Sequence, residues 1–129
     1  MFRAVTPMLL VDDVNKAVAF YQDVLGARLR YSLPQNPPFE WASLLLGDVE
    51  FMFWQREAAQ REYSDVLLSS GKPSDFMVYV YVDNVHALYE LVKCKVTVLQ
   101  EPKDQFYGIR EFTVRDPFGF ILTFAQMVE

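Results

Sequence analysis

The sequence predicts an α+β fold built from two βαβββ modules. Val11-Asp12-Asp13-Val14 and Val82-Asp83-Asn84-Val85 stand 71 positions apart, and each follows a strand-like apolar run. In both places an Asx residue, the usual type of helix N-cap, leads into a helix-like pattern. A repeat of this length within 129 residues indicates two similar modules, since a solenoid needs several short repeats. We expect cupped mixed sheets with the helices outside, and we expect the function to lie in the cup.

The first module is predicted to span residues 1–56. Residues 4–11 have the apolar character of a buried strand, and Asp13 is expected to cap a helix that ends at Leu25. Gly26 stands where a helix-terminating glycine belongs. After a proline-rich loop, Gly47-Asp48 provides a hairpin turn. The three strands expected after the helix are 27–33, 41–46 and 49–54.

The second module, residues 75–129, repeats this order after a polar linker at 57–74 that contains a short helix. A helix is expected at 84–93, and Asp116-Pro117-Phe118-Gly119 suits a tight turn. The expected strands are 76–82, 96–99, 111–115 and 120–126, with a loop at 101–108. Residues 1–129 are therefore predicted to form a single domain made of two modules.

Composition excludes several classes of function. The net charge of −5 and the pI near 4.8 disfavour nucleic-acid binding, because an acidic chain repels the phosphate backbone. No segment has the roughly 18 apolar residues of a membrane span. The N-terminus lacks the pattern of a secretion signal, and Cys94 has no partner for an intrachain disulfide. These features predict a cytoplasmic protein without membrane or nucleic-acid partners.

Two stretches resemble the vicinal oxygen chelate superfamily, which includes glyoxalase I, extradiol dioxygenases and bleomycin-resistance proteins. They are Ala19-Phe20-Tyr21-Gln22-Asp23-Val24-Leu25-Gly26 and Tyr107-Gly108-Ile109-Arg110-Glu111-Phe112-Thr113-Val114-Arg115-Asp116-Pro117-Phe118-Gly119. The second stretch is most similar to the metal-free bleomycin-resistance branch. The resemblance implies paired βαβββ modules whose sheets form cups, a homodimer that sometimes exchanges strands, and a small-molecule ligand.

Enzymes of this superfamily hold a divalent metal ion with His and Glu side chains that face the cup. The resemblance places those positions at Thr6, Met52, Met77 and Thr123. A neutral hydroxyl or a soft thioether is a poor ligand for such an ion, so we expect neither a metal nor another cofactor. His86, the only histidine, is expected on the exposed side of the second helix. No catalytic residue is predicted.

Strand alternation predicts which side chains face the cup. Val78, Val80 and Val82 should face the helix, which leaves the alternate residues of that strand for the cup. The residues predicted to line the cup or its rim are Glu50, Met52, Trp54, Met77, Tyr79, Tyr81, Trp41, Tyr107 and Thr123. Such a groove binds planar or extended apolar molecules by area and stacking, and Glu50 provides a partner for a cationic group.

The leading hypothesis is a metal-independent binding protein that sequesters a planar or apolar ligand in an aromatic groove at a dimer interface. The hypothesis allows the ligand to carry a cationic group. Two alternatives remain open. The first is a glyoxalase-like or dioxygenase-like metalloenzyme with displaced ligands, which metal content would reveal. The second is a non-catalytic interaction module whose cup is filled by its own side chains, in which case no open groove would exist.

Overall fold

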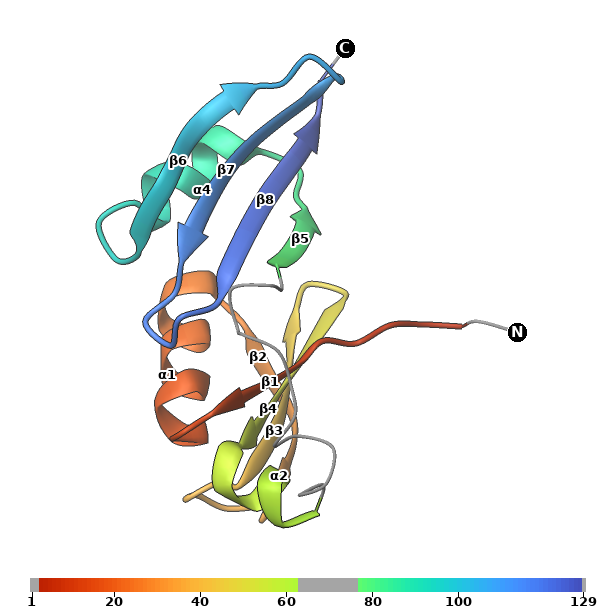
Figure 1. The fold of residues 1–129 in the computed structure, drawn as a ribbon, viewed down its shortest axis with the longest axis vertical. Coiled ribbons are helices and arrows are strands. Elements are labelled where there is room, and N and C mark those ends of the chain that lie inside the picture. Colours follow the sequence, from red (N-terminus) through yellow and green to blue (C-terminus); the bar gives the residue numbers. More distant parts are fainter. Residues whose placement is uncertain (1–2, 63–76, 129) are drawn as a thin grey trace. The chain divides into compact units, whose positions relative to one another are not determined.

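The computed structural model describes residues 3–62 and 77–128, and its chain forms two compact units, residues 1–70 and 71–129 (Figure 1). In the described part of each unit, four strands form one mixed sheet with a helix packed against it. The predicted α+β class and the two βαβββ modules are therefore confirmed.

The first unit has its sheet in the order β1-β4-β3-β2. β1 pairs in parallel with β4, and the other neighbours are antiparallel. α1 packs against β2, β3 and β4, while α2 contacts β1 and β4. The elements are β1 (Met8–Val11), α1 (Val14–Leu25), β2 (Arg28–Leu33), β3 (Trp41–Leu46), β4 (Val49–Gln55) and α2 (Arg56–Glu62).

The second unit repeats this topology with the strand order β5-β8-β7-β6. β5 pairs in parallel with β8, and β8, β7 and β6 follow one another antiparallel. α4 packs against β6, β7 and β8. The elements are β5 (Met77–Tyr81), α4 (Val85–Val92), β6 (Thr97–Asp104), β7 (Ile109–Arg115) and β8 (Ile121–Met127).

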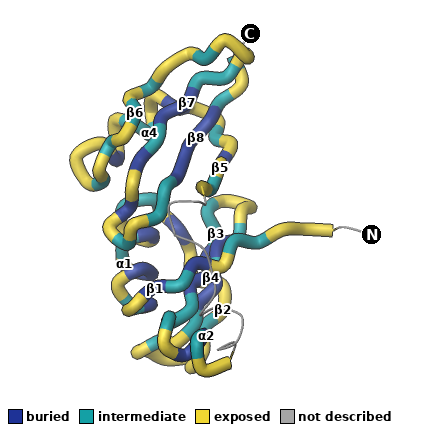
Figure 2. The backbone as a smooth tube through the Cα atoms, viewed as in Figure 1, coloured by how far each residue is buried: buried dark blue, intermediate teal, exposed yellow. Residues whose placement is uncertain are grey.

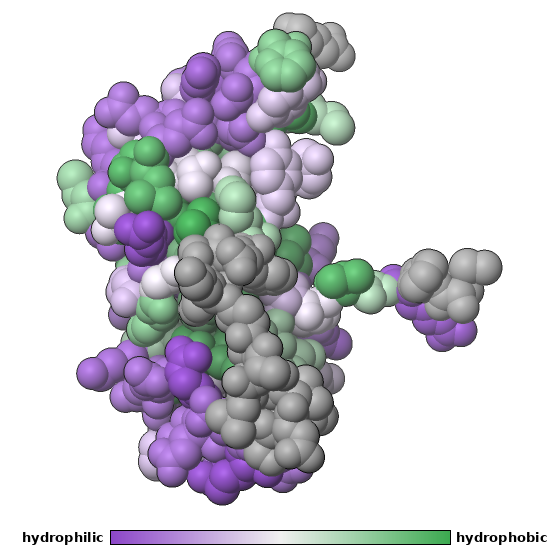
Figure 3. All heavy atoms as spheres, in the orientation of Figure 1, coloured by the Kyte–Doolittle hydropathy of each residue, from purple (hydrophilic) through white to green (hydrophobic). Residues whose placement is uncertain are grey.

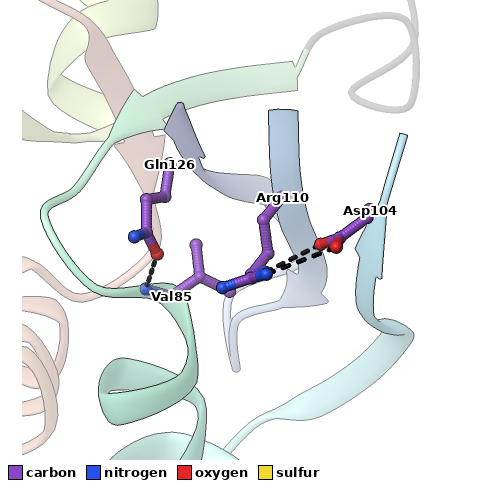
Figure 4. Close-up of polar contacts among 4 residues, drawn as sticks. All are labelled: Val85, Asp104, Arg110 and Gln126. Atoms are coloured by element: carbon purple, nitrogen blue, oxygen red, sulfur yellow. Dashed lines mark hydrogen bonds and ion pairs between the residues drawn. The ribbon is translucent and has the colours of Figure 1, made fainter. Parts of the chain in front are cut away.

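The repeated Asx residues cap both helices, as predicted. The Asp13 carboxylate accepts hydrogen bonds from the backbone N–H groups of Asn15 and Lys16. The Asn84 side chain accepts one from Ala87 at 3.0 Å. In the second unit, the side-chain oxygen of Gln126 also accepts the Val85 N–H at 2.8 Å, which ties the start of α4 to β8 (Figure 4). These bonds satisfy donors that the first helical turn leaves unpaired.

Each core lies between a helix and one face of its sheet (Figure 2). In the first unit, the fully buried Tyr21 ring packs on Phe53 and Phe51, with ring centroids 4.8 and 5.9 Å apart. In the second unit, Phe112 lies 5.3 Å from the Tyr89 ring and 5.2 Å from Phe124. Both helices therefore bury aromatic side chains from their sheets.

Gly26 ends α1 as predicted. Its φ of 73° lies in the left-handed region, which a glycine adopts without steric cost. Its N–H donates to the carbonyl of Gln22, and the next N–H, from Ala27, donates to that of Tyr21. These bonds satisfy carbonyls at the helix end and turn the chain into β2.

Two predicted boundaries are wrong by several residues, and the others differ by at most two. The first strand begins at Met8 rather than at residue 4, because Pro7 has no N–H and its carbonyl alone joins the ladder, by accepting from Met52. The predicted loop at 101–108 begins only after Asp104, since β6 continues to that residue. β6 is an edge strand with two register shifts, and such strands tolerate a proline, here Pro102.

α2 occupies the start of the predicted linker at 57–74. It is the expected short helix, and its Ala58 and Ala59 are buried. The rest of that linker, and Phe76 of the predicted strand, lie outside the described residues. The division into modules at 1–56 and 75–129 stays a prediction. No helix in residues 3–62 or 77–128 is long and apolar enough to cross a membrane.

Candidate functional site

Each sheet has one face turned away from α1 or α4, which we call its open face. In β4 the core side is formed by Phe51 and Phe53, and the alternate residues Glu50, Met52 and Trp54 are only partly buried. In β5, Val80 is buried, whereas its neighbours Tyr79 and Tyr81 are exposed. The structure thus places the residues of these two strands on the faces that alternation predicted.

The open face of the first sheet contains a hollow of about 460 Å³. Trp41 and Trp54 are directly opposite each other in the β3–β4 register, and both line it. Because indole rings offer large apolar faces, the hollow suits a flat ligand. We call it the tryptophan hollow, and its lining residues are Met8, Leu33, Glu40, Trp41, Trp54, Ala58, Arg61 and Glu62.

Charged side chains from α2 and the β2–β3 loop border the tryptophan hollow. Arg61 pairs with Glu40 at 3.4 Å and with Glu57 at 3.6 Å, and the side chain of Arg61 is 61% exposed. Ion pairs this exposed contribute little to stability. These charges therefore contribute little to holding α2 in place.

Glu50 is held in a network on the same open face. One carboxylate oxygen accepts a hydrogen bond from Thr6 at 3.3 Å and lies 3.7 Å from the Arg30 guanidinium. The other accepts from the hydroxyl of Ser43, which is fully buried. A buried hydroxyl needs such a partner, so Glu50 has a structural role besides the predicted contact with a ligand cation.

A second carboxylate, Glu111 on β7, lies on the open face of the second sheet and is only 5% exposed. Its two oxygens accept hydrogen bonds from the hydroxyls of Tyr79, at 2.7 Å, and Tyr107, at 2.5 Å. The Tyr79 ring packs edge-on against Tyr81, with centroids 5.5 Å apart. We call Glu111 with these three tyrosines the tyrosine cluster.

The tyrosine cluster raises the pKa of two phenols. Tyr79 is 44% exposed overall, but burial and the hydrogen bond to Glu111 raise the pKa of its phenol well above the ordinary tyrosine value of 10.0. The hydrogen bond to Glu111 is also the main reason for the raised pKa of Tyr107. Both phenols therefore stay protonated donors at neutral pH.

The four positions at which related enzymes bind metal do not supply a ligand set here. Thr123 is 2% exposed and its hydroxyl pairs with that of Thr113 at 2.8 Å, while Thr6 donates to Glu50. The other two positions are methionines. Across residues 3–62 and 77–128, no three His, Cys, Asp or Glu side chains gather in a group that could hold a metal ion. The residues present do not fit the divalent metal of the related enzymes.

The predicted site residues fall into separate groups. Trp41 and Trp54 line the tryptophan hollow, Glu50 and Met52 lie beside it in the same sheet, and the tyrosines belong to the second unit. Met77 is 54% exposed at the start of β5, and Thr123 is buried in the middle of β8. His86 is exposed on α4, as predicted, and Cys94 is exposed as well.

Sequence reasoning missed one wall of the tryptophan hollow and the centre of the tyrosine cluster. Ala58, Arg61 and Glu62 fall in the segment interpreted as helix and linker. The available sequence signal is the pair Ala58-Ala59 within an otherwise polar stretch. Both alanines are buried in the structure, where they form the side of the helix that packs on the sheet. Glu111 and Thr113 alternate with apolar residues along β7, so both lie on the same face of the strand. Polar residues in this pattern indicate a face whose side chains form hydrogen bonds with one another.

Known proteins resemble this chain over nearly its whole length. Bleomycin resistance proteins from Geobacillus stearothermophilus and Staphylococcus aureus are 26% identical over 132 residues, which covers 95% of this chain and 96% of theirs. A bleomycin-binding protein from Streptomyces verticillus, solved with copper(II)-bleomycin, has a similar fold (TM-score 0.64, 22% identity, 100% and 98% of the two chains).

An enzyme of the glyoxalase/bleomycin resistance protein/dioxygenase family from Burkholderia phytofirmans is also similar in fold (TM-score 0.78, 20% identity, 95% of this chain and 97% of that one). A sequence profile of one superfamily matches residues 3–124. The paired βαβββ topology and this match lead to one conclusion: the chain belongs to the glyoxalase/bleomycin resistance protein/dioxygenase superfamily.

Proposed function

We propose that this protein is a metal-independent binding protein of the bleomycin-resistance type, which sequesters a planar or apolar small molecule without making or breaking a bond. The ligand stacks on aromatic side chains of the open faces, and a homodimer completes the groove. We also propose that the protein acts in the cytoplasm.

The tryptophan hollow is the observation that carries this proposal. A volume of about 460 Å³ lies within the range of small-molecule sites, and two indole rings, Met8 and Leu33 give it mostly apolar walls. Ligands bind such walls through buried area and ring stacking, which need no reactive group. An open hollow also argues against a cup filled by its own side chains.

The chemistry of the donor set supports binding over metal catalysis. A Lewis-acid mechanism needs anionic or imidazole ligands around the ion. At the positions where related enzymes supply them, this chain has hydroxyls and thioethers, and two of the hydroxyls already bond to Glu50 and Thr113. We therefore favour sequestration over the lyase or dioxygenase alternative.

Tryptophan fluorescence offers a direct test, because the chain contains only two tryptophans and both line the hollow. Titration with metal-free bleomycin should change the emission saturably. Trp54→Leu should weaken binding at least about tenfold, as expected when a buried aromatic anchor is lost, while Trp41 still reports binding. Leu91→Ser on the exposed side of α4 is the matched control and should bind like the wild type.

A different result would redirect the proposal. If Trp54→Leu bound bleomycin as tightly as the wild type, the tryptophan hollow would not be the ligand site. If bleomycin had no effect on either tryptophan, the same titration with flat apolar dyes would separate a wrong ligand from a wrong site. No saturable change with any of them would contradict a binding role for this hollow.

A further inference from the structure

We propose that the tyrosine cluster of the second unit is a binding site for an alkylated ammonium group, held on the faces of Tyr79, Tyr81 and Tyr107 with the Glu111 carboxylate behind them. This inference rests on the proposed binding function and deepens it, because it names a chemical class that the ligand carries.

The first step is the charge of Glu111. A carboxylate that is 95% buried is costly unless a cation or several donors compensate it. Its two hydrogen bonds come from neutral phenols, and no Lys or Arg in the described part of the chain forms an ion pair with it. Arg110 is engaged by Asp104 at 2.7 Å (Figure 4), and Lys103, opposite Glu111 in the β6–β7 register, is exposed.

The second step is the effect of that charge on the rings. A phenol that donates its proton toward a carboxylate becomes richer in electrons, so its ring face attracts a cation more strongly. Tyr79 and Tyr107 both donate to Glu111, and 44% and 52% of their surfaces remain exposed. A cation on these faces needs no direct contact with the buried carboxylate.

The third step is the space beside Tyr81. Tyr81, 62% exposed, lines a hollow of about 400 Å³ together with Asp83, Gln126 and the exposed Met127. Next to Tyr81 in the β5–β8 register is Ala125, which also faces Glu111 across β7–β8. Asp83 adds a second carboxylate, and the methionine adds an apolar wall, which suits the methyl groups of an alkylated ammonium.

The repeat strengthens the argument. Trp41 and Trp54 are register partners in the first sheet, and Glu111 and Ala125 are partners at the equivalent place in the second. In the first sheet this position has two indole rings, which suit a flat apolar group. In the second sheet it has a carboxylate that accepts hydrogen bonds from two tyrosines, and this arrangement suits a cationic group. Figure 3 shows that hydrophobic and hydrophilic residues are intermixed on the face in view.

Tetramethylammonium chloride is the probe for this site, and tert-butanol is its neutral counterpart of similar shape. NMR of ring-labelled tyrosines in the full chain should show saturable shifts of Tyr79, Tyr81 and Tyr107 with the cation and none with the alcohol. Glu111→Gln should weaken the cation at least about threefold, within the range of cation–π energies. Tyr81→Leu should weaken binding of the cation to a similar extent and leaves the buried carboxylate in place. It therefore tests the site even if the Glu111→Gln variant does not fold.

Tyr31→Leu is the matched control, because Tyr31 is 58% exposed but lies on β2 in the first unit. It should leave the tetramethylammonium affinity unchanged. Equal affinities for wild type and Tyr81→Leu, or equal shifts with the alcohol, would overturn the inference. The readout uses neither bleomycin nor tryptophan fluorescence, so its failure would leave the proposed function in place, and failure of the fluorescence test would leave this site in place.

Discussion

Glu50 and Glu111 are carboxylates on the two open faces, and hydroxyl groups hold both of them in fixed positions. Ser43 and Thr6 donate to Glu50, and two phenols donate to Glu111. Hydrogen bonds of this kind, with one charged partner, are stronger than neutral ones. At the scale of single residues, these networks fix the positions of the two carboxylates on the open faces.

Glu111 controls the alkaline titration of two tyrosines. The pKa values of Tyr79 and Tyr107 are raised in the folded state, so folding favours the protonated phenols. Their contribution to stability is fully present below about pH 10, the ordinary pKa of tyrosine, and is lost as the pH rises through the folded pKa. In a spectrophotometric titration near 295 nm, Glu111→Gln should release two tyrosinates at lower pH than the wild type. Identical titration curves would contradict the cluster.

Glu50 and Ser43 should behave as a coupled pair. Glu50→Leu leaves the buried Ser43 hydroxyl without its acceptor, which should lower the free energy of unfolding by about 1–3 kcal/mol. Adding Ser43→Ala removes the orphaned hydroxyl and should restore part of that loss. Urea unfolding of the wild type, both single variants and the double variant measures the coupling. Strictly additive losses would show that the hydrogen bond contributes nothing.

Single residues were predictable where alternation applied. The open-face assignment of Glu50, Met52 and Trp54 followed from the period of two along β4, because Phe51 and Phe53 need the core. Their hydrogen-bond partners were not predictable, since they depend on register between strands distant in sequence. The hydrogen bond from Thr6 to Glu50, two residues that stand 44 positions apart in the sequence, is an example.

At the scale of elements, the two helix caps and the strand order repeat, whereas the edges of the sheets differ from the prediction. Asx caps and the glycine after α1 have local causes, so the sequence alone predicted them. The length of β6 is set by its pairing with β7, which compensates for Pro102. The late start of β1 likewise reflects pairing with β4 and the missing N–H of Pro7.

The Asp13 cap should make the stability of α1 depend on pH. Burial alone would raise the pKa of Asp13, but hydrogen bonds from Asn15 and Lys16 outweigh it, and the folded pKa falls below 3.8. The cap therefore stabilises the fold above that pH, and its contribution is lost as the pH falls through the folded pKa. Asp13→Ala should cost about 0.5–2 kcal/mol at pH 7 and less at pH 3.

Urea unfolding of wild type and Asp13→Ala at the two pH values provides the comparison. Asp13→Asn serves as the control, because an uncharged cap accepts the same N–H groups without titrating. An equal loss for Asp13→Ala at pH 7 and pH 3 would mean that the charge of the carboxylate plays no part in the cap.

At the scale of the whole molecule, superfamily membership accounts for the fold but not for the chemistry. The superfamily includes enzymes and binding proteins, so function has to be argued from the site. The repeat predicted the two modules, and strand alternation predicted that Trp54, Tyr79 and Tyr81 lie on the open faces. The fold and the open faces were within reach of sequence reasoning because they depend on period and topology. The wall of the tryptophan hollow that α2 supplies could not be predicted, because the sequence of a polar segment does not indicate which surface it packs against.

Homodimer formation is the prediction that follows from exposed apolar side chains on the open faces. Met8 and Met77 are 44% and 54% exposed, and exposed apolar surface of this kind commonly marks an interface. Light scattering coupled to size exclusion should give a mass near 30 kDa, about twice the 15.0 kDa of the chain. Met77→Asp should shift the protein toward the monomer, while Leu91→Asp on α4 should not. A mass of one chain across the concentration range would exclude the dimer.

The central claim is that the protein binds a small molecule without a metal ion, and a thermal-shift titration tests it most directly. Purified protein is titrated separately with metal-free bleomycin and with Zn²⁺, Ni²⁺, Mn²⁺ and Fe²⁺. A ligand that binds only the folded state adds about 2.7 kcal/mol at one hundred times its Kd, so bleomycin should raise the unfolding temperature saturably while the metal ions leave it unchanged. A saturable rise with one metal ion and none with bleomycin would contradict the account.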